Sequence, residues 1–273
     1  MSYKSVLVNL DIDAPLAPVV MAAADLAERL GAKLIGFCAA DAPIPITGPG
    51  GEVLAAEAWQ QMRSDIEGKF KELHDQFGKM FAGRIPTEWC QALDNPSRAL
   101  ALRSRIADLI IMSAPEGVAA GHAYRQADPG SVVLQAGRPL LLLARGTEQV
   151  QMKDVVIAWK DTREARRAVA DAVPLLRLAL NVTVVTVAAE RGQWVDQSVA
   201  DIVGFLARHG VEARSKVLEN SDDSGRLVEF IVANHVDLVV SGAYGHSRLR
   251  EWAFGGMTRS LLDETGLNRL MSS

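Results

Sequence analysis

Apolar runs of strand length alternate with stretches of helical period along the chain. In the second half, the run 155–159 (VVIAW) precedes a stretch over 164–180 whose Ala, Val and Leu residues fall on one helical face. Further strands are predicted over 182–188, 211–218 and 237–242, and further helical stretches cover 194–210 and 224–235. Runs rich in Val, Ile and Leu that are separated by helices are typical of a parallel sheet covered on both faces.

The two halves of the chain repeat one another. Residues 4–11 align with 153–160, 31–40 with 181–190, 107–115 with 236–244, and 128–144 with 254–272. Four matched segments in the same order indicate a duplication. The sequence therefore predicts an α/β protein of two tandem Rossmann-like domains, residues 1–146 and 151–273. Each is expected to hold an open five-stranded parallel sheet flanked by helices, and the first adds a Pro/Gly-rich loop (41–51) and a long charged helix (52–82).

Composition narrows the classes of partner. The chain has 273 residues, of which 49% are hydrophobic and 23% charged, and its formal net charge is −4. No block of Lys or Arg runs along it, which argues against nucleic acid. The apolar runs are too short to span a membrane, and no secretory signal is recognisable at the start. Two well-separated cysteines, Cys38 and Cys90, suit free thiols, so we expect a cytoplasmic protein with no metal site.

A glycine pattern near the end of the second half is the clearest pointer to a ligand. Gly242, Gly245 and Gly255 are spaced as G-x2-G-x9-G, and Gly242 is the last residue of the apolar run 237–242. A glycine loop between a strand and a helix leaves backbone N–H groups open at a positive helix end. The pattern predicts a site for a polyphosphate at the carboxyl end of that strand.

This loop, inside a duplicated α/β unit, resembles the nucleotide loop of the universal stress protein family, and the chain resembles a tandem member of it. The resemblance implies ATP binding, with Gly242 and Gly245 near the ribose and phosphates and Gly255 holding phosphates at the helix start. Gly256 stands where the family has Ser or Thr. Met257 and Thr258 match the positions that continue the helix start.

The positions expected at the nucleoside end depart from the family pattern. Lys160 occupies the place of the usual acid after the first strand, followed by Asp161, so either Asp161 supplies the acid or Lys160 meets a phosphate. Val187 is near the position that faces the base. Arg248, inside the loop, is the best candidate for neutralising phosphate charge.

The first half keeps only part of the pattern. Asp11 stands where the acid belongs, and Gly130 and Ser131 match the final Gly-Ser pair. The first glycine pair is replaced by residues 113–116 (SAPE), whose Cβ atoms and proline ring would block close backbone approach. The first nucleotide loop is therefore expected to be degenerate.

The resulting hypothesis is a regulatory protein of the stress response that binds ATP in its second half. The sequence leaves open whether Mg²⁺ accompanies the phosphates, and no catalytic set stands at motif spacing, so at most slow ATP hydrolysis is expected. A homodimer with unknown protein partners is expected. Two rivals remain: an interaction module that binds no nucleotide, and an enzyme with a small-ligand site near Asp11, Asp13 and the 41–51 loop.

Overall fold

The structure, a computed structural model, describes residues 2–45, 52–81, 84–114, 122–220, 223–243 and 266–273. In the first half of the chain the elements are β1 (Ser5–Leu10), α1 (Ala17–Leu30), β2 (Lys33–Ala40), α2 (Glu52–Phe81), β3 (Thr87–Leu93), α3 (Pro96–Arg103), η1 (Ser104–Ile106), β4 (Leu109–Ser113), η2 (His122–Tyr124), α4 (Pro129–Gln135) and β5 (Leu140–Leu143). In the second half they are β6 (Asp154–Ala158), α5 (Arg163–Leu176), β7 (Asn181–Ala188), α6 (Gln193–Arg208), β8 (Ala213–Glu219), α7 (Asp223–Ala233), β9 (Leu238–Gly242) and β10 (Asn268–Ser272).

All described strands belong to one ten-stranded sheet, in the order β3-β2-β1-β4-β5-β10-β9-β6-β7-β8. Each half contributes five strands with the same internal order, and neighbours within a half are parallel. The predicted pair of five-stranded α/β units is therefore confirmed. The domain limits at 146 and 151 fall in the connection between β5 and β6 and stay a prediction.

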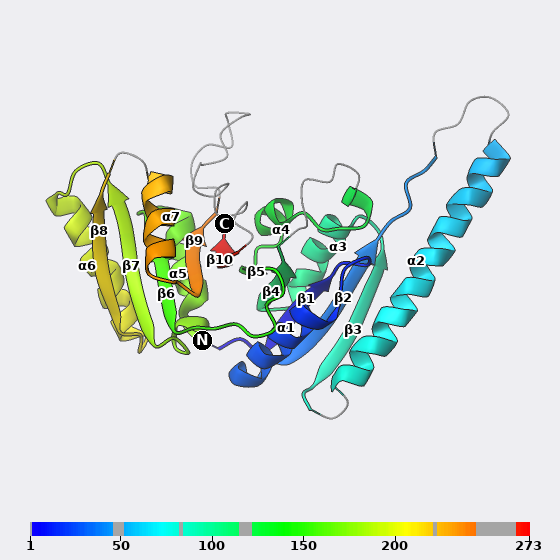
Figure 1. Cartoon of the computed structure of the whole chain (residues 1–273), viewed down its shortest axis with the longest axis horizontal. Helices are drawn as coiled ribbons and strands as arrows, with labels where there is room; N and C mark the ends of the chain where they lie inside the picture. The colour runs from blue at the N-terminus through cyan, green and yellow to red at the C-terminus, as the bar shows by residue number, and fades with distance from the viewer. Residues whose placement is uncertain (1, 46–51, 82–83, 115–121, 221–222, 244–265) are drawn as a thin grey trace.

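The two units meet at an antiparallel pair, β5 with β10, in which Leu141 lies opposite Leu270. Hydrogen bonds reinforce this junction: the side chain of Asn268 accepts from the backbone N–H of Ala144 at 2.9 Å and donates to the carbonyl of Asp237 at 3.1 Å. No pattern in the sequence indicates this pairing. It turns two separate sheets into one continuous sheet across the molecule (Figure 1).

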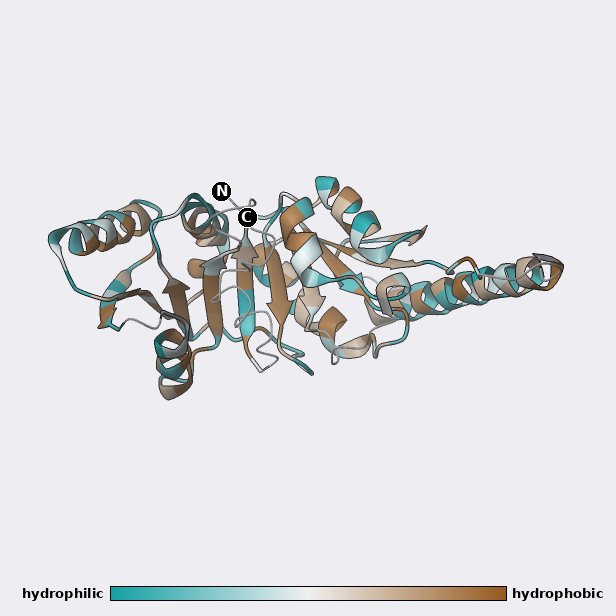
Figure 2. Ribbon diagram, turned by 90° about the horizontal axis from the view of Figure 1, so that it is seen from above, coloured by the Kyte–Doolittle hydropathy of each residue, from teal (hydrophilic) through white to brown (hydrophobic). Residues whose placement is uncertain are grey.

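Helices cover both faces of the sheet, as the apolar strands require. The buried side chains of α1, α2, α5 and α6 share one hydrophobic cluster, whereas those of α3, α4 and α7 belong to two clusters on the opposite face. Figure 2 shows the hydrophobic strands running between these helices. Helices α5 and α7 cover opposite faces of the sheet, so a ligand site is expected between the strands that they flank, β6 and β9.

Helix α2 packs on the sheet mainly through its second half. Ile66, Phe70, Leu73, Phe77 and Phe81 recur every three or four residues, the helical repeat, and are buried. The other half reaches beyond the edge of the sheet (Figures 1 and 2), and Val53 there is 71% exposed.

Candidate functional site

The carboxyl ends of β6 and β9 lie next to one another where the helical connections change face. Ala158 of β6 is paired with Ser241 of β9. The helix after β6, α5, covers one face of the sheet, and the helix before β9, α7, covers the other. Open α/β sheets bind ligands at such a switch point, outside the carboxyl ends of the strands.

The connection from β6 to α5 carries Lys160 and Asp161, both exposed. Trp159 before them is buried, and the Thr162 hydroxyl after them caps α5 by accepting from the N–H of Ala165 at 3.2 Å. The carboxylate of Asp161 lies 2.6 Å from a guanidinium nitrogen of Arg166 on the first turn of α5. Asp161 is thus charge-compensated at the start of this helix.

Gly242, the last residue of β9, is held against the start of α5. A Cβ at this position would lie 2.6 Å from the backbone nitrogen of Ala165 and 2.7 Å from the backbone carbon of Glu164. Backbone atoms cannot swing aside as a flexible side chain can, so β9 can end this close to α5 only with glycine. The structure gives Gly242 a packing role that the glycine spacing alone did not reveal.

Val187 lies near the end of β7, on the strand next to β6. It is half-buried and packs against the cluster on the α7 face of the sheet, which contains Val185 and Leu218. The adjacent Thr186 donates its hydroxyl hydrogen bond to the Trp159 carbonyl at 2.7 Å, which ties the ends of β7 and β6 together. The structure therefore places Val187 one strand away from Lys160.

The remaining predicted residues fall in 244–265, outside the described residues: Gly245, Arg248, Gly255, Gly256, Met257 and Thr258. Of the predicted site residues, the structure describes Lys160, Asp161, Val187 and Gly242. Of these, Lys160, Asp161 and Gly242 lie at the ends of the neighbouring strands β6 and β9.

Positive charge gathers at the start of α5. Between residues 160 and 167 the chain has four cationic side chains and two carboxylates, a net charge of +2 (4 − 2). The cations are Lys160, Arg163, Arg166 and Arg167, and the carboxylates are Asp161 and Glu164. The N-terminal end of a helix adds partial positive charge to these side chains. The three arginines are ion-paired, with Glu164, Asp161 and Asp171, so the helix end supplies much of the attraction for an anion.

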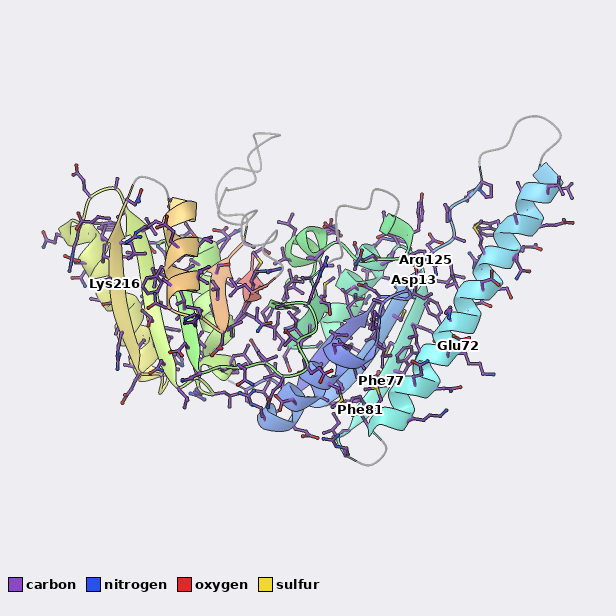
Figure 3. The ribbon with its side chains drawn as sticks, in the orientation of Figure 1. Asp13, Glu72, Phe77, Phe81, Arg125 and Lys216 are labelled. Carbon is purple, nitrogen blue, oxygen red and sulfur yellow. The ribbon has the colours of Figure 1, made fainter. Side chains whose placement is uncertain are left out.

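In the first half, the carboxylates that follow β1 are bonded by side chains of the segment before α4. Gln126 donates to the Asp11 carboxylate at 3.1 Å, and Asn9 donates to it at 3.2 Å. Arg125 forms a two-pronged ion pair with Asp13, and the two side chains lie together above β1 and β2 in Figure 3. Burial raises the pKa of Asp11 to about 6, against the two amide hydrogen bonds, which lower it.

The start of α4 in the first half is also bonded to a side chain of the same chain. Asp128 caps α4 by accepting a hydrogen bond from the backbone N–H of Ser131 at 2.7 Å. Ser131 matches a position of the nucleotide loop that is expected to contact phosphate. In the first half its N–H is therefore already bonded to a carboxylate of the same chain. The string Asp128-Pro129 is an N-cap followed by proline at the first helical position, and it could have predicted this cap. No comparable motif marks Arg125 or Gln126.

Two further features are absent from the described residues. Among them, no group of three or more His, Cys, Asp or Glu side chains is arranged to hold a metal ion. Nor does this part of the chain contain a helix that is both long and apolar enough to cross a membrane.

Known structures share this architecture along the full chain. A universal stress protein from Archaeoglobus fulgidus DSM 4304 superposes with a TM-score of 0.68 at 11% identity, covering 98% of this chain and 96% of that one. A protein of unknown function from Pseudomonas aeruginosa PAO1 gives a TM-score of 0.59 at 13% identity, covering 99% and 92%. No protein-family model matches the chain, and no curated protein matches it. The predicted resemblance to universal stress proteins is thus confirmed in the fold.

Proposed function

We propose that the second half binds an adenine nucleotide, with ATP as the ligand, at the carboxyl ends of β6 and β9. One observation carries the proposal: the switch point brings the positively charged start of α5 against the end of β9, from which the glycine pattern continues. Phosphates favour such a place because helix N-termini and cationic side chains both stabilise negative charge.

Each described residue has a defined task in this proposal. Lys160 is placed to meet a phosphate because it is exposed and directly follows β6, whose end is paired with the end of β9. Gly242 keeps β9 and α5 close together, so that the loop after it starts beside the helix. The amides for the phosphates would come from Gly245, Gly255 and the residues after them. Any Mg²⁺ would be held through phosphate oxygens and water.

Binding rather than turnover is the proposed activity, with ATP acting as a regulatory ligand in a cytoplasmic homodimer. Helix α5 offers a physical route from the site to the first half. Tyr3 donates its hydroxyl hydrogen bond to the Asp171 carbonyl on α5, and Arg167 donates to the carbonyl of Gly137 at 3.2 Å. A nucleotide that shifts the start of α5 would change these contacts, and a partner protein would sense the change.

Equilibrium titration with Mg-ATP tests the proposal. Lys160→Glu reverses the charge at the carboxyl end of β6 and is expected to weaken ATP binding at least about 10-fold, or about 1.4 kcal/mol. Gly245→Val, selected from the glycine pattern, should weaken binding similarly. Isothermal titration calorimetry gives the affinity and stoichiometry, and one nucleotide per chain is expected.

Lys153→Glu is the matched control because Lys153 is also exposed and lies just before the other end of β6. It changes the net charge equally but should leave ATP affinity within about twofold. Equal affinity of all three variants and the wild type would reject this site. Failure of the wild type to bind ATP at all would favour the interaction module without nucleotide.

A further inference from the structure

A cavity lies in the second half, between α5 and α6 and next to the connection from β6 to α5. Its volume is about 440 Å³. Its walls are mainly aromatic and aliphatic, with Trp159, Ala170, Ile202 and Phe205 as the apolar lining and Trp194 beside them. Cavities of roughly 300–1,000 Å³ hold small molecules in proteins, so this one has room for a compact ligand.

Two tryptophans line the cavity, one of them buried and the other exposed. Trp159 is buried, and its indole N–H donates to the Ser198 hydroxyl at 3.0 Å, which fixes the ring between β6 and α6. Trp194, on the first turn of α6, is 78% exposed. A large aromatic side chain left this exposed beside an apolar cavity is available to cover a bound ring.

The helices that follow the second strand of each half, α2 and α6, bury different side chains. Helix α2 presents Phe70, Phe77 and Phe81 to the cluster that it shares with α1, and all three are buried. Helix α6 is shorter, and its buried residues are the smaller Val199, Ile202 and Leu206. The one phenylalanine of α6, Phe205, is half-buried and lines the cavity.

Charge decides which aromatic ligand fits. The lining holds two carboxylates, Asp161 and Asp201, and one guanidinium, Arg166. Asp161 is paired with Arg166, whereas the Asp201 carboxylate accepts from the neutral Gln197 amide at 2.8 Å. One negative charge is therefore left over at the cavity. A positively charged ring can meet this carboxylate and also stack on the indole of Trp194.

We propose that the cavity between α5 and α6 is a binding site for a flat aromatic cation, distinct from the nucleotide site. Trp159, Ile202 and Phe205 hold the ring system, Trp194 stacks on its open side, and Asp201 neutralises its charge. The site shares the Asp161–Arg166 pair with the connection at the nucleotide site, so the two ligands would act on the same end of α5.

Berberine, a flat aromatic cation whose fluorescence rises in apolar surroundings, is a suitable probe. We expect one berberine per chain, and at least about 10-fold weaker binding of the anionic aromatic probe 8-anilinonaphthalene-1-sulfonate. Ala170→Phe places a ring in the cavity and should weaken berberine binding at least about 10-fold. Asp201→Asn removes the charge at constant shape and should weaken it about threefold or more.

Ala207→Phe is the matched control, since Ala207 is an exposed alanine of α6 that does not line the cavity. It should bind berberine like the wild type, and circular dichroism should show that both Phe variants are folded. Gly245→Val, which keeps the charge of the chain, should also bind berberine normally, and this separates the cavity from the nucleotide site. Unchanged berberine affinity in Ala170→Phe, equal loss in Ala207→Phe, or equal affinity for the anionic probe would overturn the proposal.

Discussion

Gly242→Ala tests whether β9 and α5 are packed as closely as the structure has them. The added methyl group would lie 2.6 Å from the Ala165 nitrogen and 2.7 Å from the Glu164 carbon, well inside van der Waals contact. Both neighbours are backbone atoms, so relief requires a shift of the start of α5 or of the end of β9. Overpacking of this kind costs about 1–3 kcal/mol of unfolding free energy.

Gly68→Ala is the opposite case and serves as its control. Gly68 lies inside α2, and a Cβ there would have no atom within 4 Å. Replacing a helical glycine by alanine in open space should stabilise the protein by about 0.5–1 kcal/mol. The same chemical change is thus expected to have opposite signs at the two positions.

Urea unfolding followed by far-ultraviolet circular dichroism measures both variants on one scale. If Gly242→Ala is as stable as the wild type while Gly68→Ala is stabilised, the close approach of β9 and α5 is wrong. If both are stabilised, neither glycine is required by packing. A destabilised Gly242→Ala would also mean that a loss of ATP affinity in this variant cannot be taken as evidence for direct contact with nucleotide.

Two further predictions concern the first half. Burial raises the pKa of Asp11 to about 6, so the folded state binds the proton of this carboxyl more tightly than the unfolded state does. Protonated Asp11 therefore stabilises the folded state at low pH, and this contribution is lost as the pH rises from about 4 to 6. Between pH 4.5 and 7.5 the unfolding free energy of the wild type should fall by about 2 kcal/mol more than that of Asp11→Asn, as measured by urea unfolding. Parallel pH profiles of the two proteins would contradict this prediction. Phe77→Ala should cost about 3–5 kcal/mol, because Phe77 is 2% exposed and its ring contacts those of Phe81 and Trp89. Val53→Ala, on the exposed part of the same helix, should change thermal stability little, and a similar loss in both variants would show that α2 is packed along its whole length.

The strands were predictable because burial on both faces leaves a continuous apolar signal. The run 237–242 contains β9, and the duplication placed the matching strands in both halves. The pairing of β5 with β10 left no such signal. Both strands are short, and nothing in LLLL or NRLMS encodes which neighbour, or which direction, each will take.

The candidate site was predictable only in part, and for a related reason. Glycine spacing identified Gly242, but its closest neighbours, Glu164 and Ala165, are about 80 residues away in sequence and meet it only in the folded sheet. The same holds for Gln126, which contacts Asp11 from a segment with no recognisable motif. Long-range contacts between single polar residues have no periodicity, so sequence patterns do not reveal them.

The position of β10 has a consequence for synthesis of the chain. β5 can pair with β4 as soon as both have been made, but its other edge stays unpaired until residues 268–272 emerge, about 125 residues later. A nascent chain therefore carries an apolar strand edge that another polypeptide could capture. Ribosome-bound intermediates of this protein are expected to need a chaperone most while the second half is being translated.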